Sequence, residues 1–275
     1  MAKIIAICNQ KGGVAKTTTS INLSSYLAAE NRKTLLIDLD PQSNATSGIG
    51  IDKQSVTYSI YNVLHEHTAI ESIIKTTQVD NLSIAPSSLD LTGAEVELVN
   101  ALSREYRLKK SLDTISQKYD YIIIDCPPSL GLLTINALTA AGSVLIPIQC
   151  EYYALEGLSQ LTRTVSLIKA NLNSNLQIEG VLLTMADYRT NLTKEVIDEV
   201  KKFFGAKVYK TVIPRSIKLT EAPGFGKPIL MYDKSSIGAK AYQALAKEVL
   251  NEFTQPIENN EVAVKEEELD GKEIG

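Results

Sequence analysis

The chain has 275 residues, 44% of them hydrophobic and 22% charged, and a net charge of −4, which is the composition of a soluble globular protein. No uninterrupted apolar stretch approaches the roughly 20 residues that a membrane-spanning helix needs, and the N-terminus lacks the basic and apolar regions of a signal peptide. These features exclude a membrane-embedded class and predict a cytoplasmic protein.

Apolar segments of strand length alternate with longer amphipathic segments along the chain. The predicted strands are continuously apolar and rich in Ile, Val and Leu, and they cover residues 3–8, 34–39, 82–85, 121–126, 143–150 and 178–184. The predicted helices have apolar residues at three- and four-residue spacing, and they cover residues 17–30, 92–116, 132–141, 157–172, 193–204 and 237–253. Strands that are apolar throughout are typical of a parallel sheet. The alternation therefore predicts an α/β fold: a doubly wound, mostly parallel sheet with helices on both faces.

Residues 9–20, between the first predicted strand and the first predicted helix, read NQKGGVAKTTTS. The usual phosphate-loop pattern G-x-x-x-x-G-K-[ST] would have glycine where this chain has Gln10 and Ala15. Gly12 and Gly13 still allow a turn that exposes backbone N–H groups, and the N-terminus of the following helix favours an anion. The order of strand, turn and helix therefore predicts a polyphosphate site.

Within this loop we expect Lys16 to contact the β- and γ-phosphates and Thr17 to bind Mg²⁺ through its hydroxyl. A glycine-rich turn without a ligand is the simpler alternative, and a lysine followed by three threonines argues against it. The predicted nucleotide-binding positions of the loop are Lys11, Gly12, Gly13, Val14, Ala15, Lys16, Thr17 and Thr18.

Aspartates stand at the ends of two predicted strands. The segment YIIID places Asp125 at the carboxyl edge of the sheet, where it is expected to hold Mg²⁺ through water. The segment LLIDLD ends in Asp38 and Asp40. Such aspartates are often only turn formers. We predict that Asp40 contributes to the metal site and positions the attacking water, and that Asp38 supports the metal site or the loop. Because a carboxylate orients water more than it deprotonates it, hydrolysis should be slow.

A basic run occupies residues 201–218 and contains no acid. Its cationic residues are Lys201, Lys202, Lys207, Lys210, Arg215 and Lys218. Runs of this kind are usually solvated faces, and lysines on an edge strand also prevent aggregation. On composition alone, a solvated face and a nucleic-acid contact remain equally open.

The last part of the chain differs from the rest in charge. From Gln255 onward there are seven acids and two lysines, so the preceding residues are close to neutral overall. Low hydrophobicity with high net charge predicts disorder. We therefore predict one domain over residues 1–253 and an acidic, disordered tail over residues 254–275.

Five segments together resemble the ParA/Soj chromosome- and plasmid-partitioning ATPases, of the deviant Walker A group that also contains MinD and the nitrogenase iron protein. They read KGGVAKTTTSINL, LLIDLDPQSNATSGIG, YIIIDCPPSLGLLTINAL, PIQCEYYALEGLSQL and KVYKTVIPRSIKLTEAPGFGKPILMYD. The resemblance covers about residues 1–253. It implies a P-loop NTPase fold of the deviant Walker A type, ATPase activity, and ATP and Mg²⁺ as cofactors.

The resemblance also gives a role to the second lysine of the loop. In the family the loop reads K-G-G-x-x-K-T, and Lys11 corresponds to the signature lysine, which reaches the partner's phosphates across an ATP-bound sandwich dimer. Such a lysine acts as an arginine finger does. Ala15 is a mild departure that needs room for a methyl group and a backbone conformation available to alanine. The resemblance places the adenine near Met185 and Pro214.

The partners implied by the resemblance are double-stranded DNA, a second copy of the chain and a ParB-type centromere-binding protein. An ATP-dependent homodimer would bind DNA of the nucleoid without sequence preference, and the ParB-type partner would stimulate hydrolysis and release it. Arg189 and Lys218 match the positions of DNA-binding residues beside the dimer interface. Arg215, Lys201 and Lys202 are further candidates, although Arg215 also belongs to the segment that lines the adenine pocket.

Other functions use this fold, and the sequence weighs against two of them. A MinD-like membrane protein would need a basic amphipathic C-terminal helix, whereas this chain ends in acids. An iron–sulfur protein would need cluster-ligating cysteines, whereas Cys8, Cys126 and Cys150 form no C-x-x-C pair and are predicted to be buried free thiols. A metabolic ligase or kinase remains open.

Overall fold

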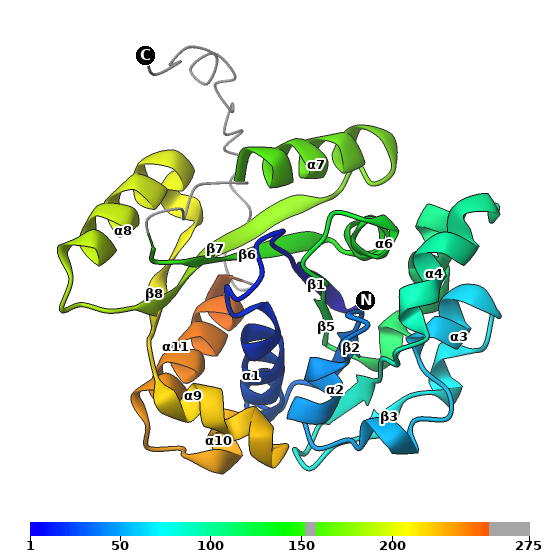
Figure 1. The fold of residues 1–275 in the computed structure, drawn as a ribbon, viewed down its shortest axis with the longest axis horizontal. Helices are drawn as coiled ribbons and strands as arrows, with labels where there is room; N and C mark the ends of the chain where they lie inside the picture. Colours follow the sequence, from blue (N-terminus) through cyan, green and yellow to red (C-terminus); the bar gives the residue numbers. More distant parts are fainter. Residues whose placement is uncertain (152–157, 253–275) are drawn as a thin grey trace.

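A computed structural model describes residues 1–151 and 158–252 (Figure 1). Its centre is an eight-stranded sheet in the order β3-β4-β2-β5-β1-β6-β7-β8, in which β3 pairs antiparallel with β4 and all other neighbours are parallel. The strands are β1 (Lys3–Ile7), β2 (Thr34–Asp38), β3 (Lys75–Thr76), β4 (Leu82–Ala85), β5 (Tyr121–Asp125), β6 (Ser143–Gln149), β7 (Gln177–Ala186) and β8 (Val208–Pro214). The predicted mostly parallel sheet is confirmed.

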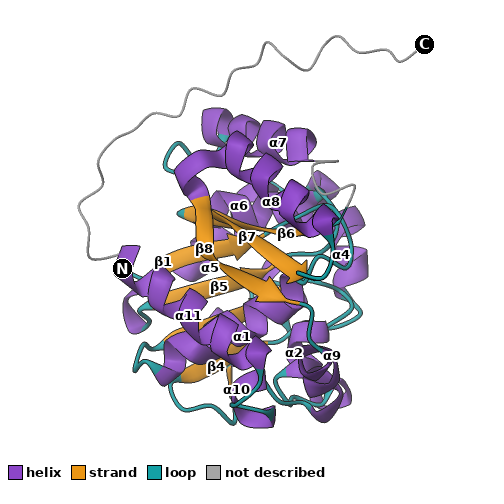
Figure 2. Ribbon diagram, turned by 90° about the vertical axis from the view of Figure 1, so that its left-hand side faces the viewer, coloured by secondary structure: helices purple, strands orange, loops and turns teal. Residues whose placement is uncertain are grey.

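Helices cover both faces of the sheet, as predicted. Figure 2 shows α6 and α7 on one side of the sheet and α1, α10 and α11 on the other. The α-helices are α1 (Lys16–Ala29), α2 (Asn44–Gly48), α3 (Ile60–His65), α4 (Leu91–Glu97), α5 (Arg107–Asp113), α6 (Leu132–Ala140), α7 (Leu158–Asn171), α8 (Asn191–Phe204), α9 (Ile217–Glu221), α10 (Ile229–Tyr232) and α11 (Ile237–Glu252).

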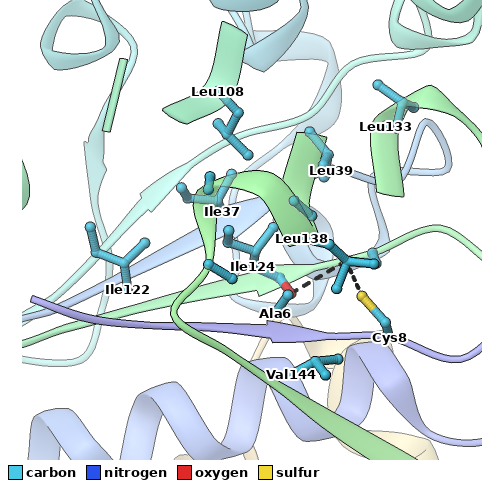
Figure 3. Close-up of a cluster of buried hydrophobic side chains, with 14 of the residues drawn as sticks. Ala6, Cys8, Ile37, Leu39, Leu108, Ile122, Ile124, Leu133, Leu138 and Val144 are labelled. Carbon is cyan, nitrogen blue, oxygen red and sulfur yellow. Dashed lines mark hydrogen bonds between the residues drawn. The ribbon is translucent and has the colours of Figure 1, made fainter. Parts of the chain in front are cut away.

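Two hydrophobic cores, one on each face, hold these layers together. Successive strand residues point to opposite faces, so Ile5 and Ile7 of β1 enter the core beneath α1 and α11, whereas Ala6 enters the core beneath α3 to α8. In the second core, shown in Figure 3, Ile37 and Ile124 meet side chains of α5 and α6. The labelled members are Ala6, Cys8, Ile37, Leu39, Leu108, Ile122, Ile124, Leu133, Leu138 and Val144. Burial on both faces explains why the central strands are apolar throughout.

The single helix predicted over residues 92–116 is wrong. The structure has two short α-helices there, α4 and α5, joined by a connection that contains two 3₁₀-helices, Leu98–Asn100 and Arg104–Tyr106. Ser103 has a φ of 53°, in the left-handed region, which an α-helix does not contain. Leu98 and Leu108 are both buried in the same core although the chain turns between them, whereas Leu102 is 89% exposed. Burial of leucines from two separate turns therefore overrides the helical spacing.

The prediction also missed the edge strands β3 and β8. In β8, Tyr209 and Ile213 are buried and Lys210 is exposed, which is the alternation of a strand with one solvated face. The Glu248 carboxylate of α11 accepts hydrogen bonds from the backbone N–H groups of Lys210 and Thr211 at 2.6 and 3.0 Å. Lys210 thus lies on a protected sheet edge, which accounts for this lysine without a nucleic-acid contact.

The sheet order brings the predicted site residues together. Because β5 lies between β1 and β2, Asp125 is in register with Ile7 on one side and Asp38 on the other. The carboxyl ends of these strands therefore meet at one edge, as expected for a ligand site in a parallel sheet. Within the described residues, no helix is both long enough and apolar enough to cross a membrane. The predicted tail, residues 254–275, lies outside the described residues, as do Gly157 and Phe253 at the predicted helix ends.

Candidate nucleotide and metal site

The loop between β1 and α1 is fixed to two neighbouring strands. Asn9 donates a side-chain hydrogen bond to the carbonyl of Pro147 in β6 at 2.7 Å, and its Oδ1 accepts the backbone N–H of Lys11 at 3.0 Å. The Thr184 hydroxyl of β7 donates to the carbonyl of Val14 at 3.2 Å. Between these anchors Gly12 and Gly13 are exposed, and Gly13 has a φ of +74°, which glycine adopts without strain. The loop is thus preformed over the start of α1.

The first turn of α1 offers an open site for an anion. It contains no acidic side chain, and its N-cap residue, Ala15, provides no side-chain hydrogen bond. Free backbone N–H groups and the helix dipole therefore remain available. The Lys16 ammonium folds back onto the Lys11 carbonyl at 3.0 Å and is largely buried. Burial lowers the pKa of Lys16, which the nearby Asp125 carboxylate opposes.

Ala15 has a left-handed backbone, with φ 69° and ψ 29°. This conformation costs a non-glycine residue roughly 1–2 kcal/mol. The sequence analysis required at this position a backbone conformation available to alanine, and the conformation that Ala15 adopts is available but strained. The position after Val14 must turn sharply to direct the following N–H groups of α1 toward the loop, and this requirement explains the glycine of the usual pattern.

We expect Ala15→Gly to raise the free energy of unfolding by about 0.5 kcal/mol, because the relieved strain exceeds the added entropy of the unfolded chain. Ala29→Gly is the matched control, since Ala29 ends α1 in ordinary geometry and is exposed. That control should lower stability by roughly 0.5–1 kcal/mol. Urea unfolding of both variants would measure the difference. Equal losses of stability would show that the strain at Ala15 has no energetic consequence.

Asp125, at the end of β5, has an environment that suits a cation-binding carboxylate. It is completely buried; Oδ1 accepts a hydrogen bond from the Ser20 hydroxyl at 2.8 Å, and Oδ2 has no partner of normal geometry in the described part of the chain. Burial and the neighbouring Asp38 raise the pKa of Asp125 to about 8, whereas the hydroxyls of Ser20 and Thr17 oppose the rise. Thr17 and Asp125 therefore face each other, and an Mg²⁺ ion would compensate the buried charge.

Asp38 and Asp40 have different environments. Asp38 is completely buried, and it accepts hydrogen bonds from the Thr46 N–H at 2.8 Å, the Thr46 hydroxyl at 2.7 Å and the Asp40 N–H at 3.2 Å. Burial raises the pKa of Asp38 to about 6. Within residues 1–151 and 158–252, the Asp40 side chain accepts only the N–H of Gln42, at 2.9 Å. Asp38 therefore organises the loop, whereas Asp40 retains hydrogen-bonding capacity for a ligand or water.

The predicted adenine residues lie side by side at the carboxyl ends of β7 and β8. Ala186 is in register with Pro214, and Arg215 donates its backbone N–H to the Ala186 carbonyl at 3.0 Å. Met185 has a φ of 52° beside a register irregularity in β7. Non-glycine residues in this region cost about 1–3 kcal/mol and cluster at functional sites. The structure thus brings Met185 and Pro214 together at the sheet edge that carries the loop.

The predicted DNA-binding residues do not form one patch. Because α8 connects the carboxyl end of β7 to the amino end of β8, its last turn, which carries Lys201 and Lys202, lies at the opposite end of the sheet from Arg189. Arg215 and Lys218 follow β8 and lie at the same end as Arg189. The basic run in the sequence is therefore divided between two ends of the molecule.

The three basic residues at the carboxyl end are exposed, and each has a carboxylate partner. These pairs are Arg189–Asp187 at 2.5 Å, Arg215–Glu151 at 3.1 Å and Lys218–Glu221 at 3.0 Å. Exposed pairs of this kind are weak and exchange readily. Binding to DNA phosphates would therefore replace these pairs rather than use unpaired cations.

The state of the three cysteines agrees with the sequence analysis. Cys8, Cys126 and Cys150 are buried free thiols, as predicted, and burial raises the pKa of Cys150 to about 11. His65 and His67 are exposed and lie outside the loop. In the described residues, no cluster of three or more His, Cys, Asp or Glu side chains could hold a metal.

Sequence reasoning missed Asn9, Ser20, Thr46 and Thr184, which position the loop and the aspartates through the hydrogen bonds described above. Ser20 follows Lys16 by one helical turn, so its spacing could have placed it on the same face of α1. The sequence holds no comparable signal for Thr184, whose contact depends on the order of the strands.

A phosphate loop at the start of a buried helix, with a buried carboxylate at an adjacent strand end, defines a P-loop nucleotide-binding protein of the α/β class. A family model described as AAA domain matches residues 2–178. The sporulation initiation inhibitor protein Soj of Bacillus subtilis is 62% identical over 249 residues, 90% of this chain and 98% of that protein. The chromosome partitioning protein ParA of Myxococcus xanthus is 52% identical over 96% of this chain and 93% of its own. The chromosome-partitioning ATPase Soj of Treponema pallidum is 50% identical over 91% of this chain and 98% of its own length. This chain belongs to the ParA/Soj family of chromosome-partitioning ATPases.

Solved structures agree on the fold. Cobyrinic acid a,c-diamide synthase of Mycobacterium smegmatis, with bound ADP and magnesium, has a TM-score of 0.82 at 36% identity and covers 92% of this chain and 96% of its own. A putative plasmid partition protein of Borrelia burgdorferi bound to AMPPNP has a TM-score of 0.78 at 30% identity. The match covers 92% of this chain and 100% of that protein's chain.

Proposed function

We propose that the chain binds ATP with Mg²⁺ and hydrolyses it slowly to control a DNA-bound dimer in chromosome or plasmid partition. The observation that supports this proposal most directly is the buried Asp125, which has one carboxylate oxygen without a hydrogen-bond partner among the described residues and lies near Thr17 and Lys16. Mg²⁺ takes few ligands from protein and completes its shell with phosphate and water. Thr17, Asp125 through water, and Asp40 at the rim would hold the ion, which would neutralise charge on the phosphates.

The nucleotide would lie with its phosphates on the loop and its adenine toward Met185 and Pro214. The loop N–H groups and the Lys16 ammonium bind the phosphates, and Asp40 orients the water for attack. Neither histidine lies in this site, so water is oriented more than it is activated and turnover is slow. A ParB-type partner would then set the rate at which the dimer is released.

The environment of the Lys11 side chain supports the proposal of an ATP-dependent dimer. It is only half-buried, and it makes no hydrogen bond or ion pair with its side chain within residues 1–151 and 158–252. A Cβ at Gly12 would meet nothing within 4 Å in a single chain. Space at Gly12 and an unengaged lysine beside it fit a second loop that approaches in the sandwich dimer.

Lys11→Ala and Gly12→Val should therefore leave the monomer folded and able to bind ATP but abolish the ATP-dependent dimer. Lysine removal deletes the contact across the interface, and valine fills the space between two loops. Multi-angle light scattering with ATP and with ADP would measure the dimer, and thermal unfolding without nucleotide would check the fold. Normal ATP-induced dimers in both variants would contradict the sandwich arrangement.

DNA binding would use the basic residues at the carboxyl end of the sheet. Dimerisation would place two such groups, each with Arg189 and Lys218, on one duplex and raise the affinity through avidity. Arg215 is a further candidate at this end. Lys201 and Lys202, at the other end, would contribute only where the duplex extends around α8.

Arg189→Glu and Lys218→Glu should weaken ATP-dependent DNA binding on every sequence and flatten its salt dependence. Each lost phosphate contact removes about 0.9 from the slope of log K against log salt. Lys202→Glu is the matched control and should have a smaller effect, since Lys202 lies at the far end of α8. Salt titrations on two unrelated duplexes would measure these slopes. A strong preference for one duplex, or equal effects of all three variants, would contradict this surface assignment.

A metabolic ligase is the second candidate, because the cobyrinic acid a,c-diamide synthase structure has the same fold. The higher identity to partitioning proteins, over nearly the whole of their length, favours partition. ATP-dependent DNA binding would separate the two functions, since a ligase does not require it.

A further inference from the structure

A cavity of about 620 Å³ lies between the segment that follows α3 and the start of α5. Its volume is in the range of ligand-binding cavities, roughly 300–1,000 Å³. The cavity is lined by residues 63, 67–71, 102, 103, 107, 110, 111 and 114, and it includes none of the residues assigned to the nucleotide or DNA. It also lies on the face of the sheet opposite to α1 and α11. It is therefore separate from the nucleotide site.

The cavity carries positive charge that no carboxylate of the described residues neutralises. Arg107 Nη1 lies 3.1 Å from Nδ1 of His67, and neither Arg107 nor Lys110 forms an ion pair in the parts of the chain described. The one acid in the lining, Glu71, is shared by Lys118 at 3.5 Å and the Thr114 hydroxyl at 3.5 Å. The charge balance of the cavity thus favours an anionic occupant.

The lining is also partly apolar. Leu102 is 89% exposed at one side of the cavity, and the buried Val63 and Ile70 lie in its wall. A simple inorganic anion would satisfy the two cations but leave Leu102 in water. An occupant that combines carboxylates with an aliphatic side chain satisfies both kinds of lining, because apolar burial and ion pairing then add.

We propose that this cavity binds the acidic C-terminal segment of the same chain, residues 254–275. The segment contains Glu266, Glu267 and Glu268 followed by Leu269 and Asp270, which is the combination of charge and aliphatic side chain that the lining requires. This inference is independent of the proposed nucleotide chemistry.

The segment is long enough to reach the cavity from the end of α11. Glu266 to Asp270 lie 14 to 18 residues beyond Glu252, and a chain of that length spans roughly 45–60 Å when extended at about 3.3 Å a residue. A domain of this size has a radius of gyration of about 18 Å and a diameter of about 46 Å, so these acids can reach most of its surface. Tethering supplies an effective concentration on the order of millimolar. A weak, salt-sensitive contact would therefore still be populated.

Zero-length carbodiimide cross-linking of the full chain tests the proposal. This reagent joins a lysine ammonium only to a carboxylate in contact with it, and peptide mass spectrometry identifies the pair. We expect Lys110 to be linked to the acids of residues 266–270. Arg107→Glu should reduce that product about fivefold through repulsion, and 1 M salt should remove it because the Debye length falls to about 3 Å. Lys109→Glu is the matched control: it makes the same charge change next to Lys110, outside the lining, and should leave the yield unchanged.

A charge swap guards against misfolding of the Arg107→Glu variant. Changing Glu266, Glu267 and Glu268 to lysine in that variant should restore contact, now as links between the new lysines and position 107. The proposal would be overturned if Lys110 is not linked to residues 266–270 in the parent chain and no link to position 107 forms in the charge-swap variant. If Lys109→Glu lowers the yield of the Lys110 cross-link as much as Arg107→Glu does, the attraction is nonspecific and the proposal is also overturned.

Two further outcomes identify a different occupant. Links that join ¹⁵N-labelled to unlabelled chains in a mixture would assign the cavity to the segment of a second copy and overturn docking within one chain. A synthetic peptide of residues 254–275 should compete with the Lys110 product. If inorganic phosphate at the same concentration competes equally well, the cavity is a simple anion site and the proposal is wrong.

Discussion

Lys16→Ala should lower ATP affinity at least about 100-fold, because charge-assisted contacts of the kind expected between this ammonium and the β- and γ-phosphates contribute roughly 1.5–3 kcal/mol each. The fold should survive, because the Lys16 side chain makes one hydrogen bond in the structure, to the Lys11 carbonyl, and is destabilised by burial. Isothermal titration calorimetry with ATP and Mg²⁺ measures the loss.

The control for this prediction is Lys33→Ala, which removes an exposed lysine at the opposite edge of the sheet, before β2. It should bind ATP as the parent chain does. Unchanged affinity in Lys16→Ala, with a normal unfolding temperature, would remove Lys16 from the phosphate site and with it the proposed nucleotide chemistry.

Asp40→Ala should lower the rate of ATP hydrolysis at least about 100-fold and leave ATP binding and the dimer intact. Among the described residues its carboxylate accepts only the Gln42 N–H, so its removal costs little stability and deletes the group expected to orient water. A DNA-bound dimer that persists with ATP should result. Phosphate release and light scattering on the same sample measure the two effects.

Asp38→Ala separates a catalytic effect from a structural one. This change would leave the N–H and hydroxyl of Thr46 and the N–H of Asp40 without their acceptor in a buried place, at a cost of about 2–4 kcal/mol. The free energy of unfolding should therefore fall in Asp38→Ala and stay close to the parent value in Asp40→Ala. Parental turnover in Asp40→Ala would show that the water is oriented by another group.

The central part of the fold is readable from the sequence because its signals are local. Strands buried on both faces must be apolar throughout, and the helices between them have a repeating apolar stripe, so β1, β2, β5 and α1 were predicted within one or two residues. The loop, Lys16 and Asp125 follow from the same logic, since each lies where a predicted strand ends or a predicted helix begins.

Other features depend on contacts between residues far apart in the chain. The region 92–116 has helical spacing throughout, yet it breaks at Ser103 because leucines on both sides are buried in one core. The edge strand β8 was hidden in a basic run, because its stability comes from Glu248 of α11 and from pairing on one side only. Local propensity carries no information on such partners.

The same division applies to the site. The sequence alone determined the residue types that can bind phosphate and a cation, since glycine, lysine, threonine and aspartate are chemically suited at those spacings. Only the tertiary structure gave the hydrogen-bond partners of Asp38 and Asp40, showed the left-handed backbone of Ala15, and separated Lys201 and Lys202 from Arg189. These properties are set by burial, by hydrogen-bond partners from other strands and by the direction of a helix, which exist only once the chain has folded.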